Sequence, residues 1–538
     1  MLRRRFLQAL ATVLLGAATG LREALALSRP RVSFRHGVAS GDPLPGAVII
    51  WTRVSTPYAD DVDVDWQVAL DEGMRQVVQH GRIATGRQRD FTVKVDVSGL
   101  EPGQRYFYRF RCAGRNSPVG QTKTLPRGDV GEARFAVVSC SNYPAGFFNA
   151  YRDIAGRDDL DAVLHLGDYI YEYGLGDYAT EHAEEIGRVP DPPGEALSLA
   201  DYRRRHAQYK TDADSIDMLA RLPLIAIWDD HEFTNDAWKG GAQNHQADEG
   251  SWPVRRDAAL QAWFEWMPVR GEPAGAGTQI FRYFRWGELL TLIMLDTRLY
   301  GRDIQPNVGE DVSAESIAAA LEDPARRMLG AEQEEWLRLA LEESSETTWQ
   351  LIGQQVMVAR MEPPDLEPLV DADGPSYFKP EALQQVIASS KAHHPQVLDV
   401  WDGYPAAKED FLRDLAAFAN NPVVLSGDLH TAMAADLQLS TGGPTVAVEM
   451  MTTSVSSPGL SAYFPDKYPH AVRDGTLAQN PHFRFLDLDH RGWLCVTVTA
   501  DECVGEWHLL DTVLSRDYQS RVASRLTARA WHLDEGLS

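Results

Sequence analysis

The sequence has 538 residues, of which 44% are hydrophobic and 24% charged, and its formal net charge is −25 at pH 7. A chain of this length can bury a large core and form more than one domain. Because it is so acidic, we do not expect it to bind nucleic acid through a broad basic surface. The acidity is compatible with hard cations, whose sites need clustered carboxylates.

The N-terminus predicts a twin-arginine signal peptide over residues 1–26. The run Arg3-Arg4-Arg5-Phe6-Leu7 fits the twin-arginine pattern, an apolar run follows over 10–21, and Ala24-Leu25-Ala26 offers a cleavage site. The apolar run is too short to be a permanent membrane span. We therefore expect the twin-arginine machinery to export the folded protein to the periplasm or the exterior. The alternative is an amphipathic start to the folded domain.

Residues 28–126 are predicted to form a β-sandwich domain. Alternating segments at 47–53, 64–70, 91–97 and 106–112 are separated by turn signals. The run 100–106 is similar to the tyrosine-corner region of fibronectin-type sandwiches. We assign no chemistry to this domain, and a short linker leads from it to a second domain at 133–538.

The second domain begins with a predicted strand–helix–strand unit. A buried strand at 135–139 ends at Cys140, a helix is expected over 149–155, and a strand at 161–166 ends in Gly167-Asp168. Parallel pairing of the strands would bring Cys140 and Asp168 to the same edge of the sheet. A cysteine at a strand end is often a small core residue, but beside a metal site its thiolate is a strong ligand for iron or zinc.

Asp168 and Tyr171 are three residues apart, so a single turn would aim both side chains at one point. A carboxylate with a phenolate suits Fe(III) or another highly charged cation. The alternative is a strand-end aspartate that caps a helix, with Tyr171 in the core.

Two later predicted strands are also followed directly by side chains of the metal-ligating type. A strand at 224–228 runs into Asp229-Asp230-His231-Glu232, with Asn235 soon after. Such ionisable groups are costly to bury unless they are paired or metal-bound, although an acidic surface loop is the alternative. A strand at 423–425 runs into Gly427-Asp428-Leu429-His430, where the aspartate and the histidine can reach one face of an extended segment.

The remaining elements include buried strands at 289–295 and 348–357, the first of which ends at Asp296-Thr297-Arg298. Segments 493–499 and 503–509 read as a hairpin. If Val498 faces Cys503, then Cys495 faces about Glu506, which disfavours a Cys495–Cys503 disulfide. No disulfide framework is expected at this size.

With these motifs in place, the sequence resembles the alkaline phosphatase D (PhoD-like) family of secreted metallophosphatases. The resemblance covers nearly the whole mature chain and includes 34–43, Ser139-Cys140, 167–172, 228–232 and 427–430. It implies an N-terminal sandwich followed by an α/β metallophosphoesterase domain of four layers, with two mixed sheets between helices. It also implies a site that holds Fe(III) with Ca(II), as the family resembles purple acid phosphatases.

Carried onto this chain, the resemblance implies a ferric ion held by Cys140, Asp168, Tyr171 and His430. Asp168 would bridge to the calcium ion, for which the best candidates are Asp230, Asn235 and Asp428. The carboxylates of Asp230 and Asp428 favour Ca(II) over Zn(II). Spacing favours Asp230 over Asp229, and we find no counterpart of the Val-x-x-His ligand of purple acid phosphatases, so the shell of the second metal is incomplete.

We therefore predict an exported alkaline phosphatase that hydrolyses phosphate monoesters and diesters through a metal-activated hydroxide. Two cations some 3.5–4 Å apart would clamp the phosphoryl oxygens. His231 is expected to protonate the leaving group or to hold a phosphoryl oxygen, and a structural histidine bonded to Glu232 is the alternative. A phospholipase D-like phosphodiesterase, with Trp263–Trp266 lining a lipid cleft, and a non-catalytic metal-dependent binding protein stay open.

Overall fold

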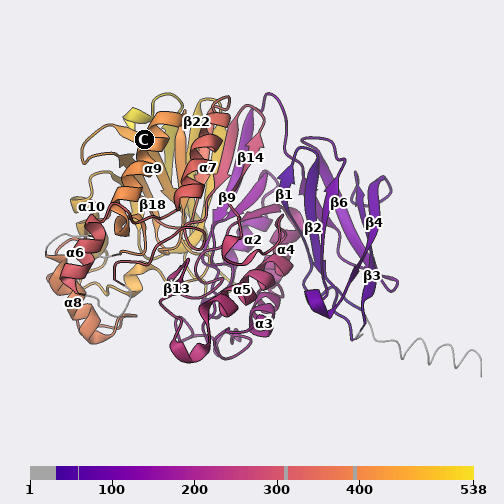
Figure 1. Ribbon diagram of the computed structural model, residues 1–538, viewed down its shortest axis with the longest axis horizontal. Coiled ribbons are helices and arrows are strands. Elements are labelled where there is room, and N and C mark those ends of the chain that lie inside the picture. Colours follow the sequence, from indigo (N-terminus) through magenta and orange to yellow (C-terminus); the bar gives the residue numbers. More distant parts are fainter. Residues whose placement is uncertain (1–31, 58–59, 308–312, 392–394, 396) are drawn as a thin grey trace, which may run out of the picture.

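The computed structural model describes residues 32–538 except 58–59, 308–312, 392–394 and 396 (Figure 1). The predicted signal peptide therefore lies outside the described residues. Within the described part of the chain, no helix has both the length and the apolar character needed to cross a membrane.

Two large sheets form the centre of the molecule, and helices cover their outer faces (Figure 1). The first sheet has, in spatial order, β23 (Ser520–Arg529), β22 (Glu502–Leu510), β21 (Arg491–Thr499), β9 (Glu132–Val138), β10 (Ala162–His165), β11 (Pro223–Ala226), β1 (Val38–Leu44), β2 (Ala47–Arg53) and β5 (Thr92–Ser98). The second has β14 (Arg282–Trp286), β15 (Leu290–Met294), β16 (Trp349–Gly353), β17 (Pro422–Ser426), β19 (Thr445–Met451), β18 (Ala432–Gln438) and β20 (Phe483–Asp487).

The two sheets pack face to face through buried aromatic side chains. The Trp507 indole donates to the carbonyl oxygen of Met451 at 2.8 Å, and Phe135 packs edge-on against Trp286 with ring centroids 4.9 Å apart. On the outer faces, α2 (Asn149–Ala155) contacts β21, α4 (Ala213–Arg221) contacts β1, and α9 (Pro405–Phe418) contacts β19. Strands covered on both faces are expected to be mostly apolar, and β10 and β17 are buried along their whole length.

The N-terminal strands form a sandwich that shares one sheet with the rest of the chain. β3 (Val62–Ala69), β4 (Val77–Thr85), β6 (Arg105–Cys112), β7 (Arg115–Asn116) and β8 (Gly120–Lys123) make a separate sheet, whereas β1, β2 and β5 extend the nine-stranded one. β1 pairs in parallel with β11. The Tyr106 hydroxyl accepts a hydrogen bond from the Glu101 amide at 2.8 Å, which is the contact of a tyrosine corner. The division into domains near residue 130 stays a prediction.

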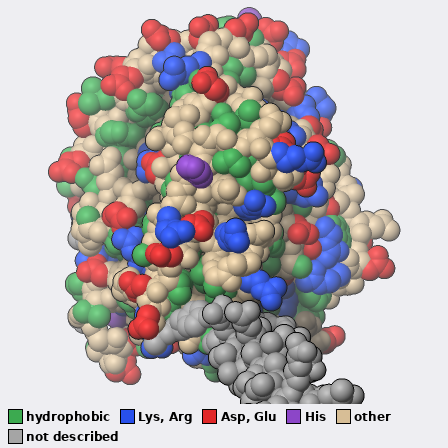
Figure 2. Space-filling view, turned by 90° about the vertical axis from the view of Figure 1, so that its right-hand side faces the viewer, with side chains coloured by type: hydrophobic (Ala, Val, Ile, Leu, Met, Phe, Trp, Pro, Cys, Tyr) green, Lys and Arg blue, Asp and Glu red, His purple; other side chains and the backbone are tan. Residues whose placement is uncertain are grey.

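Figure 2 shows the outer side of this sandwich, where Lys and Arg side chains are interspersed with Asp and Glu. Arg82 and Asp65, on neighbouring strands, form one such exposed pair at 2.6 Å. Exposed ion pairs contribute at most about 1 kcal/mol each. The sandwich therefore depends on its buried apolar cluster, which includes Val64, Tyr108 and Phe110.

Parallel pairing places the ends of the predicted strands together. β9, β10 and β11 run parallel in the first sheet, and β15, β16, β17 and β19 run parallel in the second. The segments that follow their carboxyl ends meet, which is where α/β sheets place ligand sites. The predicted hairpin register is confirmed, with Val498 opposite Cys503 and Cys495 opposite Glu506. All four cysteines are free thiols.

One predicted strand is shorter than expected. The strand predicted over 348–357 ends at Gly353. The chain leaves the sheet there because Gln354 and Gln355 use their amides to bond backbone groups; Gln355 donates to the carbonyl oxygens of Trp228 and Leu295 at 2.7 and 3.1 Å. The Gln355 side chain thus connects the segments that follow β11 and β15.

Candidate active site

Four side chains predicted from sequence as ligands of one metal converge on a buried point. Ligand atoms of Cys140, Asp168 and His430 lie within 4.8 Å of one another. The Tyr171 hydroxyl lies 2.7 Å from Asp168 Oδ2 and 3.1 Å from His430 Nε2. These residues follow β9, β10 and β17, so both large sheets contribute to the cluster.

The backbone at this cluster is held in an uncommon conformation. Cys140, Asp168, Asp428 and His430 all have positive φ angles, between 54° and 66°. Non-glycine residues rarely adopt this left-handed region, and where they do the strain is often found at functional sites. Gly167 permits a close approach here, because a Cβ on it would lie 2.3 Å from the Cβ of Asp229.

Glu232 fixes the two loops that carry the acidic residues. Its carboxylate accepts hydrogen bonds from the backbone amides of Asp168, Tyr169 and Asp229 at 2.9, 2.6 and 2.7 Å. Three bonds from two strand ends to one buried carboxylate hold the loops in register. Glu232 is thus a positioning residue, and it is not the partner of His231.

A second group of carboxylates lies beside the first. Ligand atoms of Asp168, Asp230 and His231 form one cluster, and those of Asp229, Asp230 and Asp428 form another. Asp168 is therefore common to the first group and to one cluster of the second, and its role as a bridging ligand stays a prediction. Asp230 lies in both of these clusters and Asp229 in one of them. The choice of Asp230 over Asp229 as a ligand stays a prediction.

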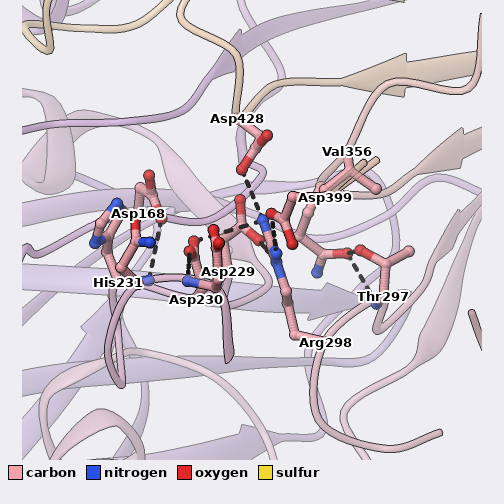
Figure 3. A network of polar contacts seen from close by, with 12 residues as sticks. Asp168, Asp229, Asp230, His231, Thr297, Arg298, Val356, Asp399 and Asp428 are labelled. Atoms are coloured by element: carbon pink, nitrogen blue, oxygen red, sulfur yellow. Dashed lines mark hydrogen bonds and ion pairs between the residues drawn. The ribbon is translucent and has the colours of Figure 1, made fainter. Parts of the chain in front are cut away.

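Arg298 lies at the centre of this acidic group (Figure 3). Its guanidinium donates to Asp229, to Asp399 at 2.5 Å and to Asp428 at 2.7 Å, and lies 3.5 Å from Asp230. Burial opposes the charge of Arg298, but the nearby Asp229 and Asp230 outweigh it and raise its pKa. A fully buried, permanently charged arginine thus neutralises part of the acidic cluster.

His231 is oriented by Glu172. Its Nδ1 lies 2.8 Å from Glu172 Oε2, and its ring stacks on Tyr171 with centroids 4.2 Å apart. Burial alone would lower the pKa of His231, but the charges of Asp230, Asp168 and Glu172 outweigh it and raise the pKa well above 6.5. When Nδ1 is hydrogen-bonded to Glu172, a protonated imidazole can still donate the proton on Nε2.

Asn235, which was also predicted to bind the second metal, is hydrogen-bonded to residues outside the carboxylate clusters described above. Its amide nitrogen donates to Gln243 Oε1 at 3.0 Å, and its backbone amide donates to Glu172 at 2.8 Å. The neighbouring Asp236 instead forms a cluster with Asp230 and Asp399. The ligand role of Asn235 stays a prediction.

Sequence reasoning assigned no role to Glu172, Asp236, Arg298 or Asp399. Arg298 had a signal, because it follows the buried strand at 289–295. Glu172 belongs to the motif that contains Asp168. Asp399 follows no strand, and only the folded chain brings it to Arg298.

The side chains of the site have ligand atoms that are suited to metal cations. Asp229 Oδ2 and Asp230 Oδ1 are buried and, among the described residues, have no hydrogen-bond partner. Burial raises the pKa values of Cys140, Asp168 and Tyr171 well above their ordinary values, so ionising them together requires a strong positive charge. A thiolate, phenolate and imidazole set fits iron, whereas the all-oxygen set around Asp230 fits a harder ion.

Comparisons with known proteins show which family and fold the chain is similar to. Residues 135–507 match the family described as PhoD-like phosphatase, and residues 20–126 match the PhoD-like phosphatase N-terminal domain. Alkaline phosphatase D of Bacillus subtilis (strain 168) is 34% identical over 536 residues, which cover 95% of this chain and 85% of that protein. A solved structure described as that of PhoD has a TM-score of 0.80 and 33% identity, over 94% of this chain and 92% of its own. The predicted fold class is confirmed.

Proposed function

The chain belongs to the PhoD-like phosphatase family and is therefore a phosphoric ester hydrolase. We propose that it cleaves phosphate monoesters and diesters at the strand ends where its two sheets meet. The observation that carries this proposal is the convergence of a thiol, a carboxylate, a phenol and an imidazole on one buried point. That donor set lies beside a second carboxylate group and His231, which together suit hydrolysis at phosphorus.

We propose that the first group holds Fe(III) through Cys140, Asp168, Tyr171 and His430. The second group would hold Ca(II) through Asp230, Asp428 and the shared Asp168, with Asn235 as a further candidate. When bound, such cations neutralise the charge of the phosphoryl oxygens and lower the pKa of water. The assignment of the two metals is supported by ligand type alone, and metal analysis of purified protein tests it.

The protein's own residues supply the rest of the chemistry. His231 would give a proton from Nε2 to the departing alkoxide, and Glu172 holds the ring in the orientation this needs. Arg298 holds Asp399 and Asp428 in place. The burial of the cluster excludes bulk water, which strengthens each of these electrostatic interactions.

The Cys140 thiolate offers a direct test of the iron site. If it binds Fe(III) with the Tyr171 phenolate, the purified enzyme should absorb visible light through ligand-to-metal charge transfer. Cys140→Ser should shift or abolish this band and reduce hydrolysis of monoesters and diesters, whereas Cys112→Ser, which alters a thiol of the N-terminal sandwich, should change neither. A colourless, iron-free and fully active enzyme would contradict the proposal.

The alternative of a phospholipase D-like phosphodiesterase is weakened by one observation. Trp263 and Trp266, which were expected to line a lipid cleft, are fully buried in the main apolar core. They cannot form an open surface in this fold, so that expectation is wrong. Assays of a phosphocholine lipid alongside a soluble monoester distinguish the two activities.

We also propose export of the folded protein by the twin-arginine route, from the pattern at Arg3-Arg4. Replacing both residues with lysine should leave the precursor in the cytoplasm, because the route reads the arginine pair rather than its charge. Arg22→Lys, outside the pattern, is the matched control. Cell fractionation followed by immunoblotting measures the outcome, and unchanged export of the double variant would indicate a different route.

A further inference from the structure

Four tyrosine rings form one border of the site. We call them the tyrosine wall: Tyr173, Tyr178, Tyr377 and Tyr463. Tyr173 lies 5.4 Å from the ring of His231, and Tyr178 lies 6.5 Å from the ring of His430, nearly parallel to it. The wall thus adjoins both the proton donor and one of the metal-ligating candidates.

The wall is continuous, although its rings come from separate parts of the chain. Tyr173 and Tyr178 follow β10, whereas Tyr377 and Tyr463 come from two later loops. Ring centroids are 5.6 Å apart between Tyr173 and Tyr178, 5.1 Å between Tyr178 and Tyr377, and 5.3 Å between Tyr377 and Tyr463. Phe378 packs edge-on behind Tyr463 at 5.3 Å, which fixes that ring.

All four tyrosine residues are half-buried, unlike the fully buried aromatic residues of the core. Their surfaces are therefore partly open, at a place where the site must admit a substrate. The border around Arg298 is charged instead, with Asp229, Asp399 and Asp428 in contact with the guanidinium (Figure 3). A flat, uncharged part of a substrate would displace water from those carboxylates without replacing its hydrogen bonds, whereas it can stack on tyrosine.

The position of His231 indicates which part of the substrate the wall receives. A general acid must lie within hydrogen-bonding reach of the leaving oxygen. The substituent on that oxygen then extends past the His231 ring, which has Tyr171 on one face and Tyr173 next to it. From this arrangement, which rests on the proposed role of His231, we propose that the tyrosine wall binds the leaving group and selects phosphoesters whose leaving alcohol carries a planar ring.

Benzyl phosphate and butyl phosphate test this selection, because both release a primary alcohol and only one carries a ring. The metal-loaded wild-type enzyme should show the higher kcat/KM for benzyl phosphate. Tyr173→Leu and Tyr463→Leu should each lower the benzyl-to-butyl ratio by about 3- to 10-fold, the usual range for one lost aromatic contact. Tyr173→Phe and Tyr463→Phe keep the ring and should keep the ratio. Tyr468→Leu, at a surface position that is 66% exposed, is the control.

Inhibition by benzylphosphonate and butylphosphonate gives a second readout that needs no turnover. The leucine variants should weaken the first inhibitor and leave the second unchanged. An equal preference for the two esters in the wild type, or an equal loss on both in the leucine variants, would overturn the wall as a leaving-group site while hydrolysis itself stands. Failure of the metal-loaded wild type to hydrolyse either ester would overturn the proposed function, and the wall with it.

Discussion

Replacing His231 with alanine should slow the hydrolysis of alkyl phosphates by roughly 10²–10⁴-fold, the usual loss when a general acid is removed. The loss should shrink for nitrophenyl phosphate, because a leaving group of low pKa departs without a proton. Metal content should stay near normal, because in the proposed role His231 Nε2 gives a proton and binds no metal. Steady-state kinetics on both substrates and elemental analysis of the same preparations measure these effects.

The matched control is His532→Ala, at an exposed position with 62% of its side chain accessible. It should leave both rates unchanged. Glu172→Gln should fall between the control and His231→Ala, because the amide still accepts a hydrogen bond from Nδ1 but no longer stabilises the imidazolium. If His231→Ala strips metal, or slows good and poor leaving groups equally, then His231 is a ligand or a phosphoryl clamp and its role as an acid is wrong.

The strand ends of the site could be predicted because each carries its own local signal. Cys140, Asp168 and Asp428 follow short apolar runs. Parallel pairing of β9 and β10 brings the segments of Cys140 and Asp168 to one sheet edge, and Asp428 follows β17 of the second sheet. The structure adds contacts between residues that no short stretch of sequence contains together. Glu232 bonds amides from two strand ends, and Asp399 reaches Arg298 from a segment without a strand. Such contacts join residues far apart in sequence, and spacing does not encode them.

The sheet shared by the sandwich and the later strands was also beyond prediction. β1 was not among the strands predicted for the sandwich, and it pairs in parallel with β11 as well as antiparallel with β2. Asp42, next to that pairing, is buried and forms an ion pair with Arg282 on β14 at 2.7 Å. A buried pair of this kind fixes how the sandwich docks, but neither residue has a local pattern that names the other as its partner.

Arg298→Met should lower the free energy of unfolding of the metal-free protein by about 3–5 kcal/mol, the usual cost of removing one partner from a buried ion pair. The methionine fills similar space but leaves Asp229, Asp399 and Asp428 facing one another without their cation. Unfolding in urea with a chelator present measures the loss. Arg285→Met is the control, because Arg285 forms an exposed pair with Glu346 and should cost no more than about 1 kcal/mol.

Added calcium should restore part of the free energy of unfolding that Arg298→Met loses. The gain should exceed the increase that calcium gives to Arg285→Met. A divalent ion bound by the folded state stabilises it by mass action, and the variant has more uncompensated carboxylate charge for that ion to meet. Magnesium, which is smaller and stricter in geometry, should restore less. If Arg298→Met unfolds no more easily than the control, the carboxylates around it are already protonated or separated, and Arg298 does not hold the acidic group together.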